Sequence, residues 1–182
     1  MLQQIRGVML TLAAGVVLIS TGCTASGGVV VPDRAVPISI ETAVEAQTIG
    51  MAALATGNVE WTESQFSSFL SELLKANTGK NMPVEAITVW FEPDQIYFRL
   101  QLVEDVLPAA FGTTLDAVGT VAITDGHLTI DLQEAAAGPY TVSGAMLAPI
   151  NAQLNNALAG AVMNLPVAVK LESGKLMIGM VQ

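Results

Sequence analysis

The amino-acid sequence predicts an α+β domain in which a curved antiparallel sheet of three hairpins packs on amphipathic helices. Residues 62–76 place apolar side chains at the spacing of a helix with one buried face. Three later pairs of segments alternate apolar and polar residues, which is the period of a strand. The middle pair is joined by Asp125-Gly126, a favoured two-residue hairpin turn. Because each hairpin has one apolar face, we expect one sheet covered by the helices.

The first helix is expected to begin at Ser39 and to end at Gly57-Asn58. Glu41 lies in its first turn, where negative charge suits the helix dipole. A short extended segment, residues 59–61, follows it. The face that we predict to be buried consists of Ile40, Val44, Met51 and Leu54.

The second helix, residues 62–76, has the clearest pattern in the chain. Thr62 and Gln65 have the Thr-x-x-Gln spacing of a capping box. Its buried face is predicted to contain Phe66, Phe69, Leu70, Leu73 and Leu74. The opposite face, which we expect to meet solvent, contains Ser67, Ser68, Ser71, Glu72 and Lys75. This pattern favours a core helix that covers a sheet.

Three hairpins account for most of the remaining chain. The predicted strand pairs are 87–91 with 96–102, 115–124 with 127–133, and 167–171 with 176–180. Pro93-Asp94 and Ser173-Gly174 supply the turns of the first and third pairs.

Between the second and third hairpins the sequence predicts a break and a third helix. Residues 135–139 (Ala-Ala-Ala-Gly-Pro) are the expected break, and Pro149 is placed in the first helical turn. Leu165-Pro166 is expected to end this helix. Its apolar stripe is Ile150, Leu154, Ala157, Leu158, Ala161 and Val162.

The amino terminus has the three parts of a secretory signal. Residues 1–6 carry one positive charge, residues 7–19 are an uninterrupted apolar run, and small residues lead into Cys23. This arrangement resembles the lipobox of bacterial lipoproteins, whose cysteine is lipidated and becomes the mature amino terminus. An exported chain with one cysteine can form no internal disulfide, so lipidation gives this thiol a role. An uncleaved anchor helix, or ordinary cleavage after Ala25, are the alternatives.

The lipobox divides the chain into a signal peptide (1–22), a lipidated cysteine with a tether (23–37), and one α+β domain (38–182). Acyl chains such as palmitate would anchor the protein in the cell envelope. We expect it on the outer face of the cytoplasmic membrane or on an outer membrane. A single acyl chain binds a membrane only marginally, so two or more are expected.

Charge and composition limit the partners of the chain. Its net charge is −9, and loss of Arg6 with the signal changes this to about −10. Such a surface repels nucleic acid and anionic lipid headgroups. Charged residues make up 13% of the chain and hydrophobic residues 52%. Either a large core or an apolar surface that serves a ligand, a partner or the bilayer is therefore expected.

The sequence contains no recognisable set of catalytic residues. The one histidine, His127, follows a turn on the predicted wet face of a strand, where a structural role is expected. No Gly-x-Ser-x-Gly or Ser-x-x-Lys motif and no phosphate-binding glycine loop occurs. One histidine cannot anchor a zinc site. We therefore expect a protein that is not an enzyme and has neither a cofactor nor a metal.

Residues 59–181 resemble the YpmS-like and LmeA-like bacterial envelope proteins, which are linked to tubular lipid-binding domains. The shared features are a helix opening at residues 62–66 (Thr-Glu-Ser-Gln-Phe), two hairpins, a proline-led helix, and a final Leu-Pro strand with a Ser-Gly turn. The resemblance implies an apolar groove between helix and curved sheet that is able to hold an acyl chain. The residues that we predict to line it are Phe69, Leu73, Phe98, Leu154, Ile178 and Met180.

Two functional hypotheses follow. In the first, the tethered domain binds a lipid or another apolar ligand in this groove. In the second, the same apolar stripes fill a closed core, and the domain is a structural or accessory lipoprotein that binds a protein partner.

Overall fold

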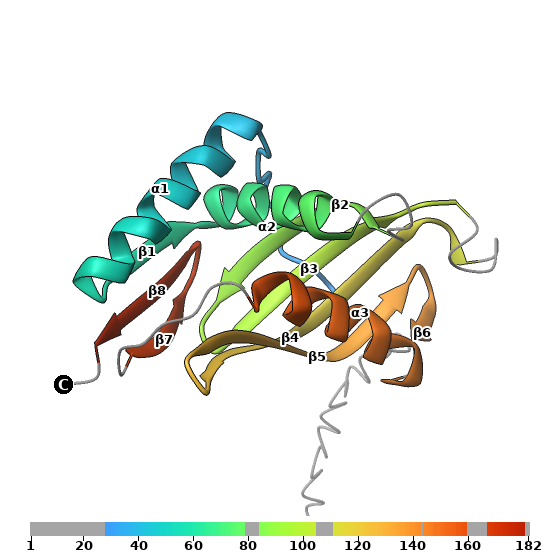
Figure 1. Ribbon diagram of the computed structural model, residues 1–182. Coiled ribbons are helices and arrows are strands. Elements are labelled where there is room, and N and C mark those ends of the chain that lie inside the picture. The colour runs from blue at the N-terminus through green and yellow to red at the C-terminus, as the bar shows by residue number, and fades with distance from the viewer. Residues whose placement is uncertain (1–27, 79–83, 105–110, 143, 160–166, 181–182) are drawn as a thin grey trace, which may run out of the picture.

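The computed structural model describes residues 28–78, 84–104, 111–142, 144–159 and 167–180, apart from the side chains of residues 53–56. These residues form an α+β fold with three helices and two antiparallel sheets (Figure 1). The elements in chain order are α1 (Ile40–Thr56), β1 (Val59–Thr62), α2 (Glu63–Thr78), β2 (Val84–Glu92), β3 (Gln95–Leu102), β4 (Thr114–Thr124), β5 (His127–Ala137), β6 (Tyr140–Val142), α3 (Gly144–Leu158), β7 (Val167–Glu172) and β8 (Lys175–Met180).

The predicted α+β class and the three hairpins are confirmed, with one difference in how the hairpins are arranged. The first two hairpins and β6 form a five-stranded sheet of order β2-β3-β4-β5-β6. The third hairpin instead joins β1 in a separate sheet of order β1-β8-β7. Trp61 of β1 pairs with Leu176 of β8 across 115 residues of sequence, a contact that no local pattern encodes.

The core lies between the five-stranded sheet and the helices α2 and α3, which cover one of its faces (Figure 1). Phe66, Leu70 and Leu74 of α2 are almost fully buried, as are Leu154 and Leu158 of α3. From the sheet, the largest fully buried side chains are Ile87, Phe91, Ile96, Phe98, Leu100, Leu102, Leu115 and Ile130. Along β3 and the first half of β4 the buried residues alternate with more exposed ones, which agrees with the predicted period of two, whereas in β2 Trp90 is buried as well as its neighbours.

Local signals at the predicted ends of the elements are confirmed. The Thr62 N–H donates to Gln65 Oε1 at 3.0 Å, and the Gln65 N–H donates to Thr62 Oγ1 at 3.2 Å. This is the reciprocal capping box that the sequence predicts. Gly126 and Gly174 have φ values of 77° and 81°, in the left-handed region that their hairpin turns require.

The segment 135–142 differs from the prediction. Residues 135–137 continue β5 instead of breaking it, and residues 140–142 form the short strand β6. Alanine has low strand propensity, but here all three are 0–3% exposed; Ala135 and Ala136 pair with both β4 and β6, and Ala137 pairs with β6. Burial and strand pairing override the weak intrinsic preference.

The third helix also begins earlier than predicted. It starts at Gly144, so that Pro149 lies inside the helix and not in its first turn. Leu147 is 3% exposed, and its burial draws the preceding turn into the helix. Pro149 is exposed, which limits the cost of the missing backbone hydrogen bond. The predicted helix end at Leu165-Pro166, with Ala161 and Val162, lies outside the described residues.

The serines of α2 do not face solvent, which corrects the sequence prediction. Ser67, Ser68 and Ser71 are 0–3% exposed. The Val89 N–H donates to Ser67 Oγ at 2.8 Å, and Ser71 Oγ donates to the Ile87 carbonyl at 3.1 Å. These backbone groups belong to β2, the first strand of the five-stranded sheet. One turn before Ser67, at the start of α2, Glu63 Oε1 accepts the Phe91 N–H at 2.7 Å.

The spacing of helix and strand explains this row of contacts along the β2 edge. Glu63, Ser67 and Ser71 are four residues apart, or about 6 Å along a helix. Their partners in β2 are two residues apart, or about 6.7 Å along a strand. The two repeats nearly match, so one polar side chain per helical turn can bind the exposed backbone of an edge strand. An edge closed in this way is protected from pairing with another chain.

Candidate functional site

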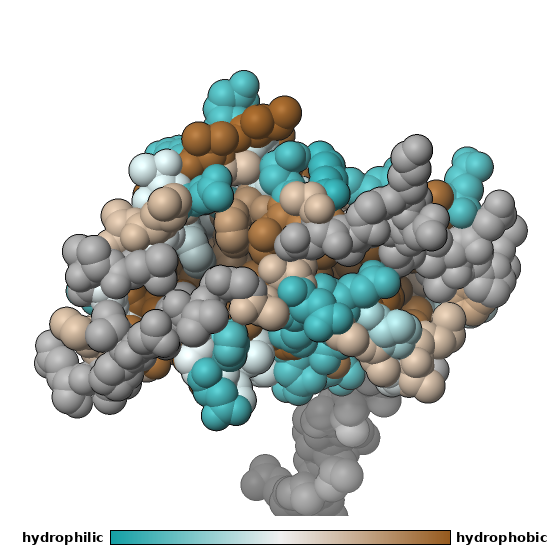
Figure 2. Space-filling view, in the orientation of Figure 1, coloured by the Kyte–Doolittle hydropathy of each residue, from teal (hydrophilic) through white to brown (hydrophobic). Residues whose placement is uncertain are grey.

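Three of the apolar residues on the predicted face of α1 point outward, which contradicts the sequence prediction, while Ile49 of the same helix packs against the core. Ile40, Val44 and Met51 are 66%, 58% and 67% exposed. The side chain of Leu54 lies outside the described part of the chain. Figure 2 shows apolar side chains gathered at the top of the molecule, over α1.

Small residues on another side of α1, together with the half-buried Ile49, make its contact with the rest of the fold. Ala43 and Ala46 are 6% and 0% exposed. A Cβ on Gly50 would lie 2.9 Å from the ring of Trp61, and the Trp61 indole N–H donates to the Ala46 carbonyl at 3.1 Å. The helix therefore approaches Trp61 closely through its small residues. Because this face is the one that fits the domain, the face with the larger side chains is left outside.

An apolar groove of about 290 Å³ lies between α1 and α2. Ile40 and Val44 line it from α1, and Phe69 and Leu73 line it from α2. Phe69 stacks on Trp61 with a distance of 5.8 Å between ring centroids, which fixes the floor of the groove. The groove opens on the same surface as the exposed side chains of α1, so both form one apolar area.

The rim of this area is acidic. Glu72 lines the groove, and Glu41 and Glu45 are exposed on α1. The backbone N–H of Glu41, and then the Ser39 hydroxyl, lower the pKa of the Glu41 carboxyl below its ordinary value. This carboxyl is therefore ionised at neutral pH, at the end of the helix where negative charge is favourable.

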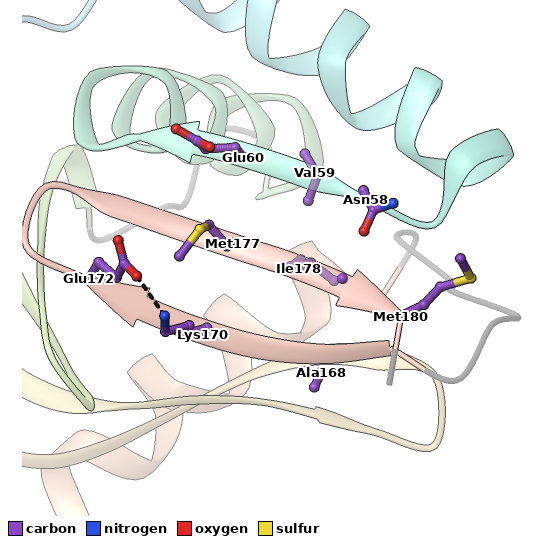
Figure 3. A pocket seen from close by; sticks show the side chains of 10 residues that line it. Asn58, Val59, Glu60, Ala168, Lys170, Glu172, Met177, Ile178 and Met180 are labelled. Atoms are coloured by element: carbon purple, nitrogen blue, oxygen red, sulfur yellow. Dashed lines mark hydrogen bonds and ion pairs between the residues drawn. The ribbon is translucent and has the colours of Figure 1, made fainter. Parts of the chain in front are cut away.

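A second, shallow hollow of about 530 Å³ lies on the outer face of the three-stranded sheet (Figure 3). Glu60, Met177 and Lys170 form a row across β1, β8 and β7. Lys175 binds Glu60 at 2.5 Å and Lys170 binds Glu172 at 2.6 Å, both in exposed positions. The hollow forms where Ala168 and Gly179, which are small, line this face of the sheet. Its charges are already paired with one another.

The six residues predicted to line a lipid groove are distributed over three places. Phe69 and Leu73 line the α1–α2 groove. Ile178 and Met180 lie at the hollow of the three-stranded sheet, with Ile178 3% and Met180 54% exposed. Phe98 and Leu154 are in the core, at 0% and 1% exposure. The structure therefore does not bring these six side chains together around one cavity.

The sequence prediction missed Ile40 and Val44 as surface residues. The available signal was the spacing of Ala43, Ala46 and Gly50, which places three small residues on one helical face. A helix that packs closely through such a face leaves its larger side chains outside.

The described part of the predicted tether, residues 28–37, is bound to the domain through Arg34. Its guanidinium forms hydrogen bonds to both oxygens of Glu63, at 3.0 and 2.5 Å, and to Glu92 at 2.6 Å. It also donates to the Phe91 carbonyl at 2.9 Å. Bonding to Glu63, and then to Glu92, raises the pKa of the Arg34 guanidinium above its ordinary value. The cation is thereby fixed between α2 and the end of β2.

Neighbouring contacts hold the same segment. Trp90 Nε1 donates to the Arg34 carbonyl at 2.9 Å, and Ser64 Oγ donates to the Pro37 carbonyl at 2.5 Å. Ser68 Oγ accepts the Ser39 N–H at 3.1 Å. At the other end of the segment, a Cβ built on Gly28 would lie 3.7 Å from the Gly138 carbonyl oxygen. The segment therefore runs from the β5–β6 turn to α2.

His127, the one histidine of the chain, begins β5. His127 is half-buried, and its Nδ1 has no hydrogen-bond partner. Within the ranges given above, no three His, Cys, Asp or Glu side chains come together as a metal site. No helix among these residues is both long and apolar enough to cross a membrane. Cys23 and the predicted signal lie outside the described residues.

Comparisons of the sequence with protein-family models and with curated proteins gave no match.

Proposed function

We propose that this chain is a non-enzymatic envelope lipoprotein, anchored through Cys23, whose α1 face binds a protein partner. The observation that carries the proposal is the outward orientation of Ile40, Val44 and Met51, beside the groove that Phe69 and Leu73 line. Exposed apolar areas of this kind mark interaction sites. The anchor rests on the signal pattern of residues 1–22 followed by Cys23.

The packing of the interior favours a surface site over an interior lipid groove. Phe98, Leu154 and Ile178 are at most 3% exposed and pack against other core side chains. An acyl chain between sheet and helices would have to displace them. A groove between two helices is instead the geometry in which an amphipathic helix of a partner binds, with its apolar side chains spaced by one turn.

The charges around the apolar area further restrict the class of protein partner that can bind there. The apolar area is flanked by Glu41 and Glu45; the third carboxylate, Glu72, is paired with Lys75 at 2.8 Å. A second copy of this chain would bring the same carboxylates against them, and this repulsion disfavours self-association. A partner segment with apolar anchors and flanking lysines or arginines is complementary. An acyl chain in the same groove is the second candidate, because Phe69 and Leu73 give it an apolar floor.

A photo-crosslinking residue at Gln47, which lines the groove, tests the binding site in the cells that produce the protein. The matched control carries the same residue at Gln95, which is exposed at the start of β3. We expect Gln47, but not Gln95, to give one discrete adduct with an envelope protein, attached at an apolar segment with basic flanks. The double change Ile40→Asn and Val44→Asn should abolish this adduct and leave the thermal midpoint nearly unchanged.

An adduct with lipid at Gln47 would support the second candidate against the first. Equal labelling from Gln47 and Gln95 would refute a binding site at α1. The anchor is tested separately by the intact mass of the membrane-extracted protein, which should carry acyl chains on Cys23. Cys23→Ala should leave an unprocessed precursor that carries no acyl chain; processing and acylated mass unchanged from wild type would refute lipidation of Cys23.

A further inference from the structure

A second apolar surface lies at the end of the five-stranded sheet where the tether leaves the domain. Val103 follows β3, Phe111 precedes β4, and Tyr140 opens β6. The pairings Gln101↔Thr114 and Ala137↔Tyr140 place these three residues at the same end of the sheet. In Figure 1 this is the right-hand end, away from α1 at the upper left.

The side chains at this end are unusually exposed for apolar residues. Tyr140 is 45% and Val103 38% exposed, and the rings of Tyr140 and Phe111 lie 4.7 Å apart. Val30, two residues beyond Gly28, is 83% exposed, and Met146 in the first turn of α3 is 42% exposed. We call these five residues (Val30, Val103, Phe111, Tyr140 and Met146) the exit surface.

The length of the tether indicates what covers the exit surface. Gly28 lies beside the Gly138 carbonyl in the turn that leads into Tyr140. Only residues 24–27 separate it from Cys23. A fully extended chain spans at most about 3.6 Å per residue, so a lipidated Cys23 lies within about 18 Å of Gly28. Because Arg34 fixes the following segment to the domain, residues 28–37 add little further reach.

We propose that the exit surface rests on the lipid bilayer, so that the domain is held in one orientation with α1 directed away from the membrane. The proposal rests on lipidation of Cys23. Tyrosine is suited to this place, because it is enriched at membrane interfaces, where its ring is half in the apolar layer. Glu104 is exposed beside Val103, so the contact suits zwitterionic headgroups better than anionic ones. The orientation leaves the α1 area accessible to a partner in the adjoining compartment.

Depth-dependent fluorescence quenching tests the orientation. The full protein, extracted from membranes with its own lipid, is reconstituted into phosphatidylcholine vesicles that contain brominated lipid. Tyr140→Trp reports on the exit surface, and Gln95→Trp, at the other end of β3, is the matched control. The native Trp61 and Trp90 are 5% and 4% exposed and give a constant background. We expect the fluorescence added by Tyr140→Trp to be lost largely to the bromines, and that added by Gln95→Trp to be retained.

A longer tether provides a second measurement. Insertion of about 20 Gly and Ser residues after Ser26 gives the domain a flexible link, and quenching of Tyr140→Trp should fall towards the control level. With Cys23 acylated, no quenching at Tyr140→Trp, or equal quenching at both sites, overturns the orientation and leaves the anchor intact. An intact mass without acyl chains on Cys23 refutes the anchor, and the orientation with it, because the short tether is its premise.

Discussion

The side-chain amide of Asn155 holds both backbone groups of Ile130. The Ile130 N–H donates to Asn155 Oδ1 at 2.8 Å, and Asn155 Nδ2 donates to the Ile130 carbonyl at 2.8 Å. One turn earlier in α3, Asn151 Oδ1 accepts the Leu132 N–H at 3.4 Å. The amide thus takes the place of a neighbouring strand on the part of β5 that β6 does not reach. Polar side chains of α2 bind the backbone of β2 in the same way, so helices cover both edges of the five-stranded sheet.

The Asn155 contact gives the first prediction. Asn155→Ala leaves the N–H and C=O of Ile130 without partners in a half-buried position, and should lower the free energy of unfolding by about 1–3 kcal/mol. Asn156→Ala, on an exposed neighbour in the same helix, should change it by less than about 0.5 kcal/mol. Urea denaturation of the two variants measures the difference. Equal destabilisation by both changes would show that the amide does not close this edge.

The second prediction concerns the buried serines of α2 that bind the backbone of β2. Ser67→Ala removes the acceptor of the buried Val89 N–H and should cost about 1–3 kcal/mol. Lys75→Ala, at the exposed end of the same helix, removes only a surface pair with Glu72 and should cost no more than about 1 kcal/mol. Hydrogen exchange of the Val89 amide should also become faster in Ser67→Ala. Unchanged protection of this amide would contradict the contact.

The third prediction concerns the contact of Arg34 with Glu63. Arg34→Ala leaves the Glu63 carboxylate, whose side chain is 11% exposed, without its cation. We expect residues 28–37 to lose hydrogen-exchange protection and the urea midpoint to fall. Arg34→Lys keeps the charge but cannot form the paired bonds to Glu63, so its effect should lie between wild type and alanine. Wild-type protection of residues 28–37 in Arg34→Ala would show that other contacts hold this segment.

The fourth prediction concerns the bulge in β5, where Gln133 is the extra residue opposite Val118 and Gly119 of β4. Register shifts between Val118 and Gly119, and a Cβ on Gly119 would overlap the Asp131 carbonyl oxygen of β5. Gly119→Ala should therefore destabilise the domain by about 1–3 kcal/mol, because backbone atoms must move. Gly144→Ala is the control, since its Cβ would meet nothing within 4 Å and alanine favours the helix. A thermal midpoint for Gly119→Ala at or above that of the control would rule out the close approach.

The elements whose signals are local could be predicted from the amino-acid sequence. The capping box of Thr62 and Gln65, the Asp125-Gly126 turn and the alternation along β2–β5 depend on neighbours in the chain, so they could be read without the fold. The same holds for the lone Cys23 after an apolar run, which stays a prediction.

Which face of a helix is buried, and which strands share a sheet, depended instead on contacts between distant parts of the chain. Ile40 and Val44 predicted a buried face of α1, but the small residues opposite them fit against Trp61 more closely. Ser67 and Asn155 have the pattern of solvent-facing residues, because a polar side chain has the same sequence signature whether it meets water or a strand edge. The pairing of Trp61 with Leu176 placed the third hairpin beside β1. Each outcome depends on contacts between distant segments, which the apolar periodicity of a single segment does not specify.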